Sequence, residues 1–165
     1  MRAAFLDRDG VINEDYGYVY KIEDFKFKEG IFELLELLKS LGFEFFIVTN
    51  QSGIARGYYT KDDFFKLTKW LLNELEQKGF NIKDVEYCSC HEKFSKNCEC
   101  RKPKPTMILN LAKKYNIDIK NSIFIGDKQT DMDAAQNAGI KNRYLVKNSL
   151  FDIIERIKND FKGSI

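Results

Sequence analysis

Short apolar runs alternate with stretches of helical periodicity along this chain, and that alternation constrains its fold more than any other feature. Such runs are typical of buried parallel strands, which present apolar side chains on both faces. The runs at 3–6 and 122–126 each stop at an aspartate. The full set comprises residues 3–6, 43–48, 85–88, 122–126 and 143–146. They predict five strands of one parallel sheet.

Between the runs, apolar residues recur at the 3.6-residue period of amphipathic helices. We expect helices at about 31–41, 60–79, 106–115, 131–138 and 150–161. Gly42 stands where a left-handed cap would end the first helix, and Thr60 can cap the start of the second. Strands alternating with helices indicate an α/β fold of Rossmann-like type, with a central parallel sheet and helices on both faces. Ligands of such sheets bind beyond the carboxyl ends of the strands, where strand order reverses.

Length and composition fit one soluble domain spanning residues 1–165. Hydrophobic residues make up 44% of the chain and charged residues 32%, as in globular proteins. No segment approaches the roughly 18 apolar residues of a membrane-spanning helix, and charge follows the first residues too soon for a secretory signal. The net charge of +2 is too balanced to indicate a nucleic-acid partner. We therefore expect a cytoplasmic protein without membrane or nucleic-acid partners, monomeric by default.

Three of the predicted strands end in polar residues that an apolar core would exclude. Asp7 and Asp9 follow the first strand, Thr49 and Asn50 the second, and Asp127 the fourth. These strand ends converge in a parallel sheet, so the three aspartates would repel one another unless a cation lies between them. Each aspartate alone would be interpreted as the cap of a turn. Together they predict a site for Mg²⁺, which prefers carboxylate oxygens.

The same residue types can hydrolyse a phosphate ester. Asp7, directly after a strand, is suited to attack phosphorus and form an acyl phosphate, which divides the reaction into two steps. Asp9 can protonate the leaving oxygen and then take a proton from water. Thr49 and Asn50 offer donors to the phosphoryl oxygens. Candidate cations for the remaining charge are Lys102, Lys104 and Lys128.

Four motifs resemble, in order, those of the haloacid dehalogenase superfamily of phosphatases. They are DRDG (7–10), VTNQ (48–51), RKP (101–103) and GDKQTD (126–131). A lone pair of aspartates is weak evidence, whereas four ordered motifs on suitable elements are specific. The longer stretches DRDGVINEDYGYV, TNQSGIARG, CECRKP and GDKQTDM are more similar to the branch that removes the 7-phosphate of heptose 1,7-bisphosphate. The likeness extends from residue 1 to about residue 146.

The resemblance implies a role for individual positions and a small phosphorylated sugar as substrate. It implies Asp7 as nucleophile, Asp9 as acid and base, and Mg²⁺ held by Asp7, the backbone carbonyl of Asp9 and Asp127. Phosphate contacts are implied for Thr49, Asn50 and Lys102. Substrate contacts are implied for Asp15, Tyr16, Gly17, Tyr18, Gln51, Ser52, Arg101 and Lys128.

All four cysteines lie within residues 88–100, a segment called the cysteine loop below. The pairs Cys88-x-Cys90 and Cys98-x-Cys100 can wrap one tetrahedral Zn²⁺, and a reducing compartment disfavours disulfides. Four protein ligands leave no position for water, so this zinc would be structural. The family pattern has Cys-x-His where this chain has a second cysteine. Cys90 holds that ligand position and is favoured, with His91 as the alternative.

The segment that joins the first strand to the first helix is too short for a separate cap domain. We call residues 11–28 the flap. We expect its aromatic side chains to pack within the flap, with Tyr18 also against the substrate. Arg56 is a candidate for binding a second anionic group, although an isolated arginine more commonly forms a surface ion pair.

Three other functions remain open from the sequence. Histidinol-phosphate phosphatases share the catalytic motifs and the zinc loop, but the segment 49–57 and the flap are more similar to the heptose branch. A non-catalytic zinc module could bind nucleic acid or protein through the basic segment 93–104. It would not need acidic residues at three strand ends. A phospho-acceptor signalling domain would use a strand-end aspartate and Mg²⁺, but neither Asp9 nor the cysteines.

Overall fold

Five parallel strands form the centre of the computed structural model, which describes residues 1–165. The strands are β1 (Ala3–Leu6), β2 (Glu44–Asn50), β3 (Ile82–Cys88), β4 (Ile123–Gly126) and β5 (Asn142–Leu145). The helices are α1 (Ile31–Ser40), α2 (Lys61–Gln77), α3 (Thr106–Tyr115), α4 (Gln129–Ala138) and α5 (Leu150–Asp160), with short 3-10 helices at Ile22–Asp24 and Ile119–Asn121. The predicted α/β fold with a parallel sheet is confirmed.

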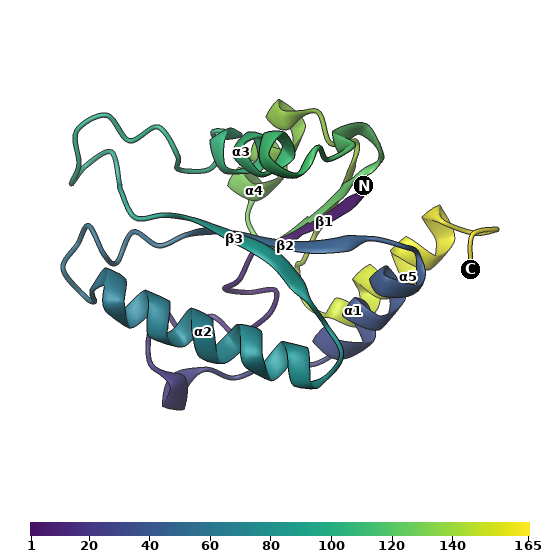
Figure 1. Cartoon of the computed structure of the whole chain (residues 1–165), viewed down its shortest axis with the longest axis horizontal. Helices are drawn as coiled ribbons and strands as arrows, with labels where there is room; N and C mark the ends of the chain where they lie inside the picture. The colour runs from purple at the N-terminus through teal and green to yellow at the C-terminus, as the bar shows by residue number, and fades with distance from the viewer.

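The strand order β3-β2-β1-β4-β5 places the first strand of the chain in the middle of the sheet (Figure 1). Leu6 of β1 pairs with Ile47 of β2 on one side and with Ile125 of β4 on the other. After β3 the chain crosses to the far side of β1, so strand order reverses between β1 and β4. Asp7, which follows β1, donates its backbone N–H to the Ile125 carbonyl at 3.0 Å. The carboxyl ends of β1 and β4 therefore lie at the crevice where ligands of such sheets bind.

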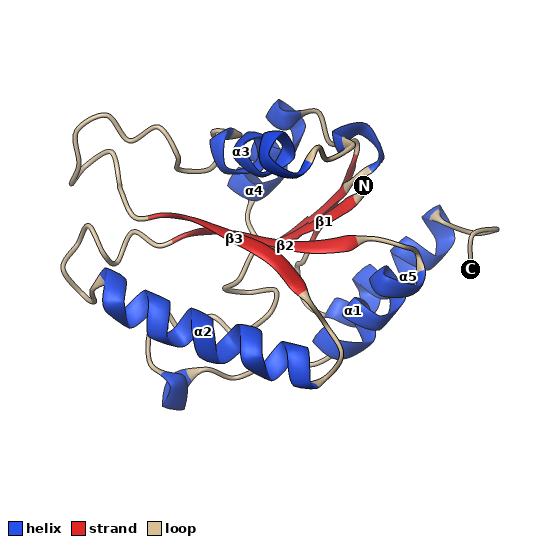
Figure 2. Cartoon of the chain, viewed as in Figure 1, coloured by secondary structure: helices blue, strands red, loops and turns tan.

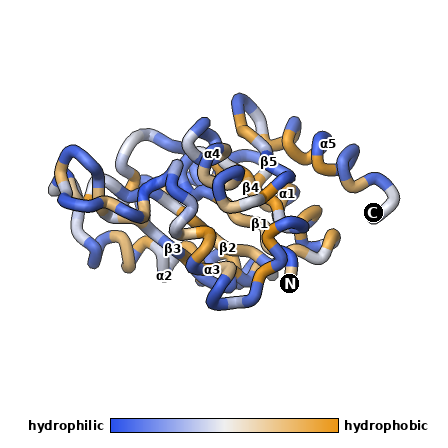
Figure 3. The backbone as a smooth tube through the Cα atoms, turned by 90° about the horizontal axis from the view of Figure 1, so that it is seen from above, coloured by the Kyte–Doolittle hydropathy of each residue, from blue (hydrophilic) through white to orange (hydrophobic).

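Helices cover both faces of the sheet, and each face has its own apolar core. Figure 2 shows α1, α2 and α5 on one side of the strands and α3 and α4 on the other. Leu6 of β1 belongs to the first core with Leu34 of α1, and Phe5 belongs to the second core with Met107 of α3. Neighbouring side chains of a strand thus enter opposite cores, as the two-residue period of a strand requires. The apolar stretches of the labelled strands stand out in the hydropathy view of Figure 3.

The helix ends follow the predicted caps. Thr60 and Asp63 form a capping box at α2, in which the Thr60 hydroxyl accepts from the Asp63 N–H at 3.1 Å and the Asp63 carboxylate accepts from the Thr60 N–H at 2.9 Å. Gly42 follows α1 with a φ of 84°, in the left-handed region that favours glycine. α4 begins at Gln129, before the predicted residue 131, because Asp131 accepts backbone hydrogen bonds from the turn that precedes it.

Two strands are longer than the apolar runs that predicted them. β2 continues through Thr49 and Asn50 because its pairing with β3 persists to Asn50 and Cys88. β3 starts at Ile82 rather than at residue 85. Thr49 and Asn50 are therefore strand residues whose position relative to the cysteine loop is set by the sheet. The cysteine loop and the segment between β2 and α2 extend from the same edge of the sheet (Figure 1).

None of the helices combines the length and the apolar character that crossing a bilayer would require.

Candidate active site

A polar cavity of about 330 Å³ opens at the carboxyl ends of the strands. Its volume is at the lower end for small-molecule sites, and only 2 of its 15 lining residues are hydrophobic. The lining includes these residues predicted from sequence: Asp7, Asp9, Asp15, Gly17, Tyr18, Asn50, Gln51, Ser52, Arg101, Lys102 and Lys128. Arg56, the candidate for binding a second anionic group, also lines the cavity, and Tyr59, Thr130 and Asp131 complete the lining. Such walls suit a small and highly charged ligand.

Three predicted site residues lie outside this lining. Thr49 is buried. Tyr16 is 65% exposed and lines a separate hollow of the flap. Asp127 lines a neighbouring cavity of about 220 Å³, which it shares with Asp15 and Gly10.

Lys102 is a buried ammonium group held between two buried carboxylates. Its Nζ donates to Asp7 Oδ1 at 3.1 Å and to the Val48 carbonyl at 3.0 Å, and it lies 2.6 Å from Asp131 Oδ1. Burial disfavours the charged form, but the two carboxylates outweigh it, so the pKa of Lys102 lies above its ordinary value. Lys102 is thus a fixed positive charge beside Asp7.

Asp131 is a site residue that the sequence reasoning missed. Its Oδ2 accepts hydrogen bonds from the backbone N–H groups of Asp127 and Lys128, each at 3.1 Å. Gly126 permits this close approach, because a Cβ at that position would lie 2.4 Å from the Asp131 Cβ. The available signal was an acidic residue in the first turn of a predicted helix, within the GDKQTD motif. Asp131 fixes both Lys102 and the turn that carries Asp127.

The carboxylate oxygens of Asp7, Asp127 and Asp131 lie within 4.8 Å of one another. Asp127 Oδ1 is buried without a hydrogen-bond partner, an orphan acceptor that a cation would satisfy. Burial raises the pKa of Asp7 well above its ordinary range; Lys102 opposes this rise, and the neighbouring carboxylates add to it. Asp131 already uses both oxygens, whereas Asp7 accepts hydrogen bonds only through Oδ1, so Asp7 and Asp127 are the carboxylates that keep an oxygen for an ion. This set of donors fits Mg²⁺.

Gly10 makes room for Asp127. Its φ of 87° lies in the left-handed region, and a Cβ at this position would come within 2.0 Å of Asp127 Oδ2. Any larger residue would displace one of the two carboxylates that are free to hold the ion.

Asp9 lies outside the carboxylate cluster and is held by donors from three side chains. Arg8 Nη2 contacts its two oxygens at 3.0 and 3.2 Å, Asn13 Nδ2 donates at 3.0 Å, and Gln51 Nε2 donates at 3.2 Å. Arg8 is only 2% exposed and also donates to the Val19 carbonyl of the flap at 2.7 Å. The orientation of Asp9 is therefore linked to the position of the flap.

A chain of hydrogen bonds fixes the side chain of Gln51. Its Nε2 donates to Thr49 Oγ1 at 2.9 Å, and its Oε1 accepts from the Tyr59 hydroxyl. Burial raises the pKa of Tyr59 to about 12, so the hydroxyl remains a donor at neutral pH. Tyr59 thereby keeps the amide nitrogen of Gln51 directed toward Thr49 and Asp9.

Asn50 holds the backbone of Lys102. Its Oδ1 accepts from the Lys102 N–H at 3.1 Å, and its Nδ2 donates to the Lys102 carbonyl at 3.5 Å. Lys128 lies 3.8 Å from Asp15 at the cavity wall. Lys104, a third candidate cation, instead donates to the Cys98 carbonyl at 2.6 Å and does not line the cavity.

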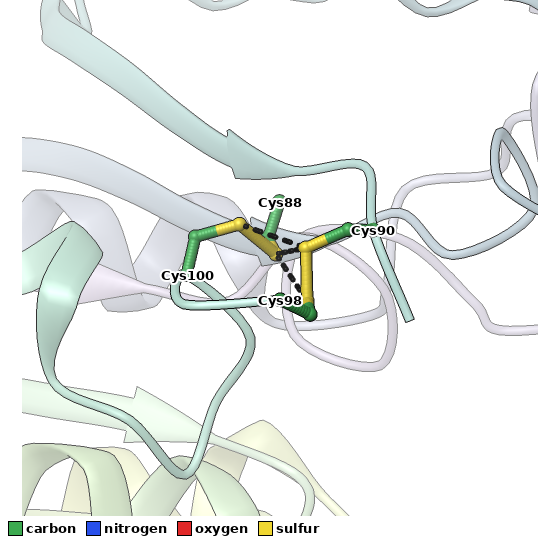
Figure 4. Close-up of side chains that lie close together, drawn as sticks. All are labelled: Cys88, Cys90, Cys98 and Cys100. Atoms are coloured by element: carbon green, nitrogen blue, oxygen red, sulfur yellow. Dashed lines mark hydrogen bonds between the residues drawn. A yellow bond between two sulfur atoms is a disulfide. The ribbon is translucent and has the colours of Figure 1, made fainter. Parts of the chain in front are cut away.

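The four cysteine sulfurs gather at one point of the cysteine loop (Figure 4). All lie within 4.8 Å of one another. Sequence reasoning expected thiols or metal ligands, whereas the structure joins Cys88 to Cys100 and Cys90 to Cys98 as disulfides. Contacts of 3.4 to 3.8 Å link the two bonded pairs. Four sulfurs this close can either pair with one another or share one tetrahedral ion.

His91 lies apart from the four sulfurs. Its Nδ1 accepts the backbone N–H of Lys93 at 3.0 Å, and its ring packs against Phe94 with the ring centroids 5.5 Å apart. The geometry therefore groups Cys90, and not His91, with the other three cysteines.

The sequence profile of haloacid dehalogenase-like hydrolases matches residues 1–139, which run from β1 to the end of α4 and contain the whole cavity. The chain belongs to the haloacid dehalogenase-like hydrolases. The resemblance carried by the four motifs is confirmed at the level of the family.

Relatives of this hydrolase are similar over most of their length. The chain is 47% identical over 152 residues to D-glycero-alpha-D-manno-heptose-1,7-bisphosphate 7-phosphatase of Photorhabdus laumondii, covering 89% of this chain and 83% of the relative. It is 51% identical over 146 residues to D-glycero-beta-D-manno-heptose-1,7-bisphosphate 7-phosphatase of Helicobacter pylori, covering 88% of this chain and 83% of that protein.

A solved structure has the same fold as this hydrolase. It is D,D-heptose 1,7-bisphosphate phosphatase from B. bronchiseptica in complex with magnesium and phosphate. The TM-score is 0.81 at 27% sequence identity, and the match covers 95% of this chain and 87% of the other.

Proposed function

We propose that this hydrolase removes the 7-phosphate of D-glycero-D-manno-heptose 1,7-bisphosphate. The observation that carries the proposal is the buried pair of Asp7 and Lys102, which opens onto a small polar cavity. Arg56, Arg101 and Lys128 line the same cavity and suit a substrate with two phosphate groups. The two relatives at 47% and 51% identity carry the name of this reaction.

In the first step a carboxylate oxygen of Asp7 attacks the phosphorus of the 7-phosphate. The bond between phosphorus and the sugar oxygen breaks, and Asp7 becomes an aspartyl phosphate. Asp9 gives its proton to the leaving sugar oxygen, so the sugar departs as a neutral alcohol. Lys102 stays beside Asp7 and offsets the negative charge that gathers around the phosphoryl group.

In the second step water attacks the aspartyl phosphate. Asp9, now ionised, takes a proton from this water, inorganic phosphate leaves, and Asp7 is restored. Arg8, Asn13 and Gln51 orient Asp9 for both transfers. Since Arg8 also contacts the Val19 carbonyl, the flap has to be in place for Asp9 to act.

Mg²⁺ is proposed at Asp7 and Asp127, with the backbone carbonyl of Asp9 as the further ligand that the family pattern implies. The orphan Oδ1 of Asp127 and the crowding of the carboxylates support this assignment. When bound, Mg²⁺ supplies positive charge between the carboxylates and the incoming phosphate.

The remaining residues are assigned by their position in the cavity. Asn50 and Lys102 are proposed to contact the transferred phosphate, and Thr49 to support it through its backbone and through Gln51. Contacts with the rest of the substrate, the sugar and its second phosphate, are proposed for Asp15, Gly17, Tyr18, Gln51, Ser52, Arg101 and Lys128, which line the cavity. Tyr16 points into a separate hollow of the flap, so we assign it only the support of the flap.

A structural Zn²⁺ is proposed for Cys88, Cys90, Cys98 and Cys100. A zinc–sulfur distance of about 2.3 Å places the sulfurs of a tetrahedral site about 3.8 Å apart. The contacts of 3.4 to 3.8 Å between the two bonded pairs are close to that spacing. In a reducing compartment the four sulfurs are available as thiolates, and a closed site would hold the cysteine loop together.

Phosphate release tests the proposed function. The purified protein, loaded with Mg²⁺, is given both anomers of heptose 1,7-bisphosphate, heptose 7-phosphate, histidinol phosphate and fructose 1,6-bisphosphate. We expect the highest kcat/KM for one heptose bisphosphate. A clear preference for histidinol phosphate would overturn the proposal.

A further inference from the structure

The cavity has a second cationic region, formed by residues that are far from Asp7 in the sequence. Arg56 lies in the segment between β2 and α2, and Arg101 directly follows the cysteine loop. Both arginines line the cavity. Two segments that are far apart in sequence therefore deliver two guanidinium groups to one site.

Neither guanidinium is satisfied by the protein. The Nε of Arg56 and the Nη1 of Arg101 are buried without a hydrogen-bond partner. Neither residue takes part in any of the nine ion pairs of the chain. Buried donors of like charge without an acceptor are costly, and a bound anion would satisfy both.

Phe94 of the cysteine loop fixes the position of Arg56. Its ring centroid lies 4.6 Å from the guanidinium carbon of Arg56, within the range of a cation–π contact. The ring of Tyr18 lies 6.0 Å from the same carbon on the flap side. Phe94 is otherwise 53% exposed, and this stacking gives a reason for a large aromatic side chain at a loop surface.

We propose that Arg56, oriented by Phe94 and acting with Arg101, binds the second phosphate of a bisphosphate substrate and so selects bisphosphates over monophosphates. The proposal rests on the proposed phosphatase function. It adds the residue that binds the second phosphate, which is not cleaved. A guanidinium offers paired N–H donors that match phosphate oxygens, which suits Arg56 to this task better than a lysine.

The test compares heptose 1,7-bisphosphate with heptose 7-phosphate, which lacks the second phosphate. For Arg56→Ala we expect kcat/KM on the bisphosphate to fall about 10- to 100-fold, mainly because KM rises. A loss of this size corresponds to one lost hydrogen bond to a charged group. Turnover of the monophosphate should stay within about 2-fold of the unmodified protein, because its reaction does not use this contact. Arg56→Lys should recover only part of the loss.

A second pair of variants tests the role of Phe94 as a positioning residue. Phe94→Leu should raise KM for the bisphosphate about 3- to 10-fold, in line with a lost cation–π contact, and Phe94→Tyr should restore it. Arg156 lies on α5 over the Tyr144 ring, so Arg156→Ala is the matched arginine control. It should leave kcat/KM unchanged for both substrates. Arg56→Ala should also bind the product heptose 1-phosphate more weakly. Calorimetry measures this binding without requiring turnover.

The outcomes separate this proposal from the proposed function. Equal losses on both substrates, or no loss on the bisphosphate, would overturn the role of Arg56 while the phosphatase stands. If the unmodified protein hydrolyses both sugar phosphates with the same kcat/KM, selection by the second phosphate is overturned. If it hydrolyses neither, the proposed function falls and this proposal with it.

Discussion

The ammonium of Lys102 lies 2.6 Å from the Asp131 carboxylate, and the side chains are only 3% and 2% exposed. The same ammonium reaches the proposed nucleophile Asp7 at 3.1 Å. Asp131 of α4 therefore sets the position of the positive charge beside Asp7, and both of its own oxygens are occupied. Removing one partner of such a buried pair leaves the other charge uncompensated.

Asp131→Asn should therefore lower both stability and turnover. We expect a loss of about 2–4 kcal/mol in the free energy of unfolding, because a buried ion pair is broken. We expect kcat to fall about 10- to 100-fold as Lys102 moves from Asp7. Urea titration and phosphate release measure the two effects. Asp133→Asn is the control on the same helix, since Asp133 is bonded only to the neighbouring Gln129 side chain. Equal behaviour of the two variants would contradict the role of Asp131.

Asp7→Asn should abolish turnover and yet stabilise the protein when Mg²⁺ is absent. The substitution removes the proposed nucleophile, and it also removes a buried charge from a cluster whose carboxylate oxygens lie within 4.8 Å of one another. We expect the melting temperature without Mg²⁺ to rise by about 2–4 °C, the shift of about 1 kcal/mol at this size. Added Mg²⁺ should stabilise the unmodified protein more than the variant. A variant that melts lower than the unmodified protein would show that the Lys102 ion pair outweighs the repulsion.

Tyr59→Phe gives a prediction on pH dependence. Burial raises the pKa of Tyr59 to about 12, so the folded state holds the hydroxyl proton more tightly than the unfolded state does. The stability that this provides is present below about pH 10, the ordinary tyrosine pKa, and is lost as pH rises toward 12. From pH 10 to 12, the free energy of unfolding should fall about 1–2 kcal/mol more for the unmodified protein than for Tyr59→Phe, after allowance for solvent screening. If the free energy of unfolding falls equally with pH in both proteins, Tyr59 is not the source of the pH dependence.

Below pH 10 the same variant tests the orientation of Gln51. Without the Tyr59 hydroxyl, Oε1 of Gln51 loses its donor and the amide is free to turn away from Asp9. We expect kcat at pH 7 to fall about 3- to 10-fold, about the effect of one hydrogen bond. An unchanged kcat would mean that Thr49 and Asp9 suffice to hold the amide.

Cys90→Ser and His91→Ala distinguish the two zinc ligands that the sequence left open. The sulfur of Cys90 contacts Cys88 and Cys100 at 3.4 Å, whereas His91 accepts a backbone hydrogen bond within its own loop. We expect His91→Ala to keep one zinc per chain and Cys90→Ser to lose zinc on dialysis. Elemental analysis of reduced protein measures the metal, and X-ray absorption should show four sulfur ligands. Three sulfurs and one nitrogen would contradict the assignment.

The fold could be predicted because its signals are local. The capping box of Thr60 and the left-handed Gly42 each depend on a few neighbouring residues, and both stand where the sequence indicated. The end of β2 could not be predicted in the same way, because Thr49 and Asn50 become strand residues only through pairing with β3. Strand length here depends on a partner that the apolar pattern does not specify.

The candidate site shows the same division. The sequence predicted that Asp7, Asp9 and Asp127 lie at one edge of the sheet, because they come just after predicted strands. It missed Asp131, whose importance comes from a contact with Lys102 that no local pattern specifies. It also missed Arg8, since an arginine beside an aspartate gives no sign of being buried and bound to the flap. Residues that act through a long-range partner were the ones that escaped prediction.

The central position of β1 has a consequence for synthesis on the ribosome. The proposed nucleophile Asp7 is among the first residues to be made, but Lys102 precedes α3 in the chain and Asp127 follows it. At about 5–20 residues per second, the rest of the chain takes on the order of ten seconds to appear. During that interval the nascent chain carries Asp7 without the groups that are proposed to activate it. We therefore expect that the nascent protein does not hydrolyse phosphate esters until α4 has left the exit tunnel.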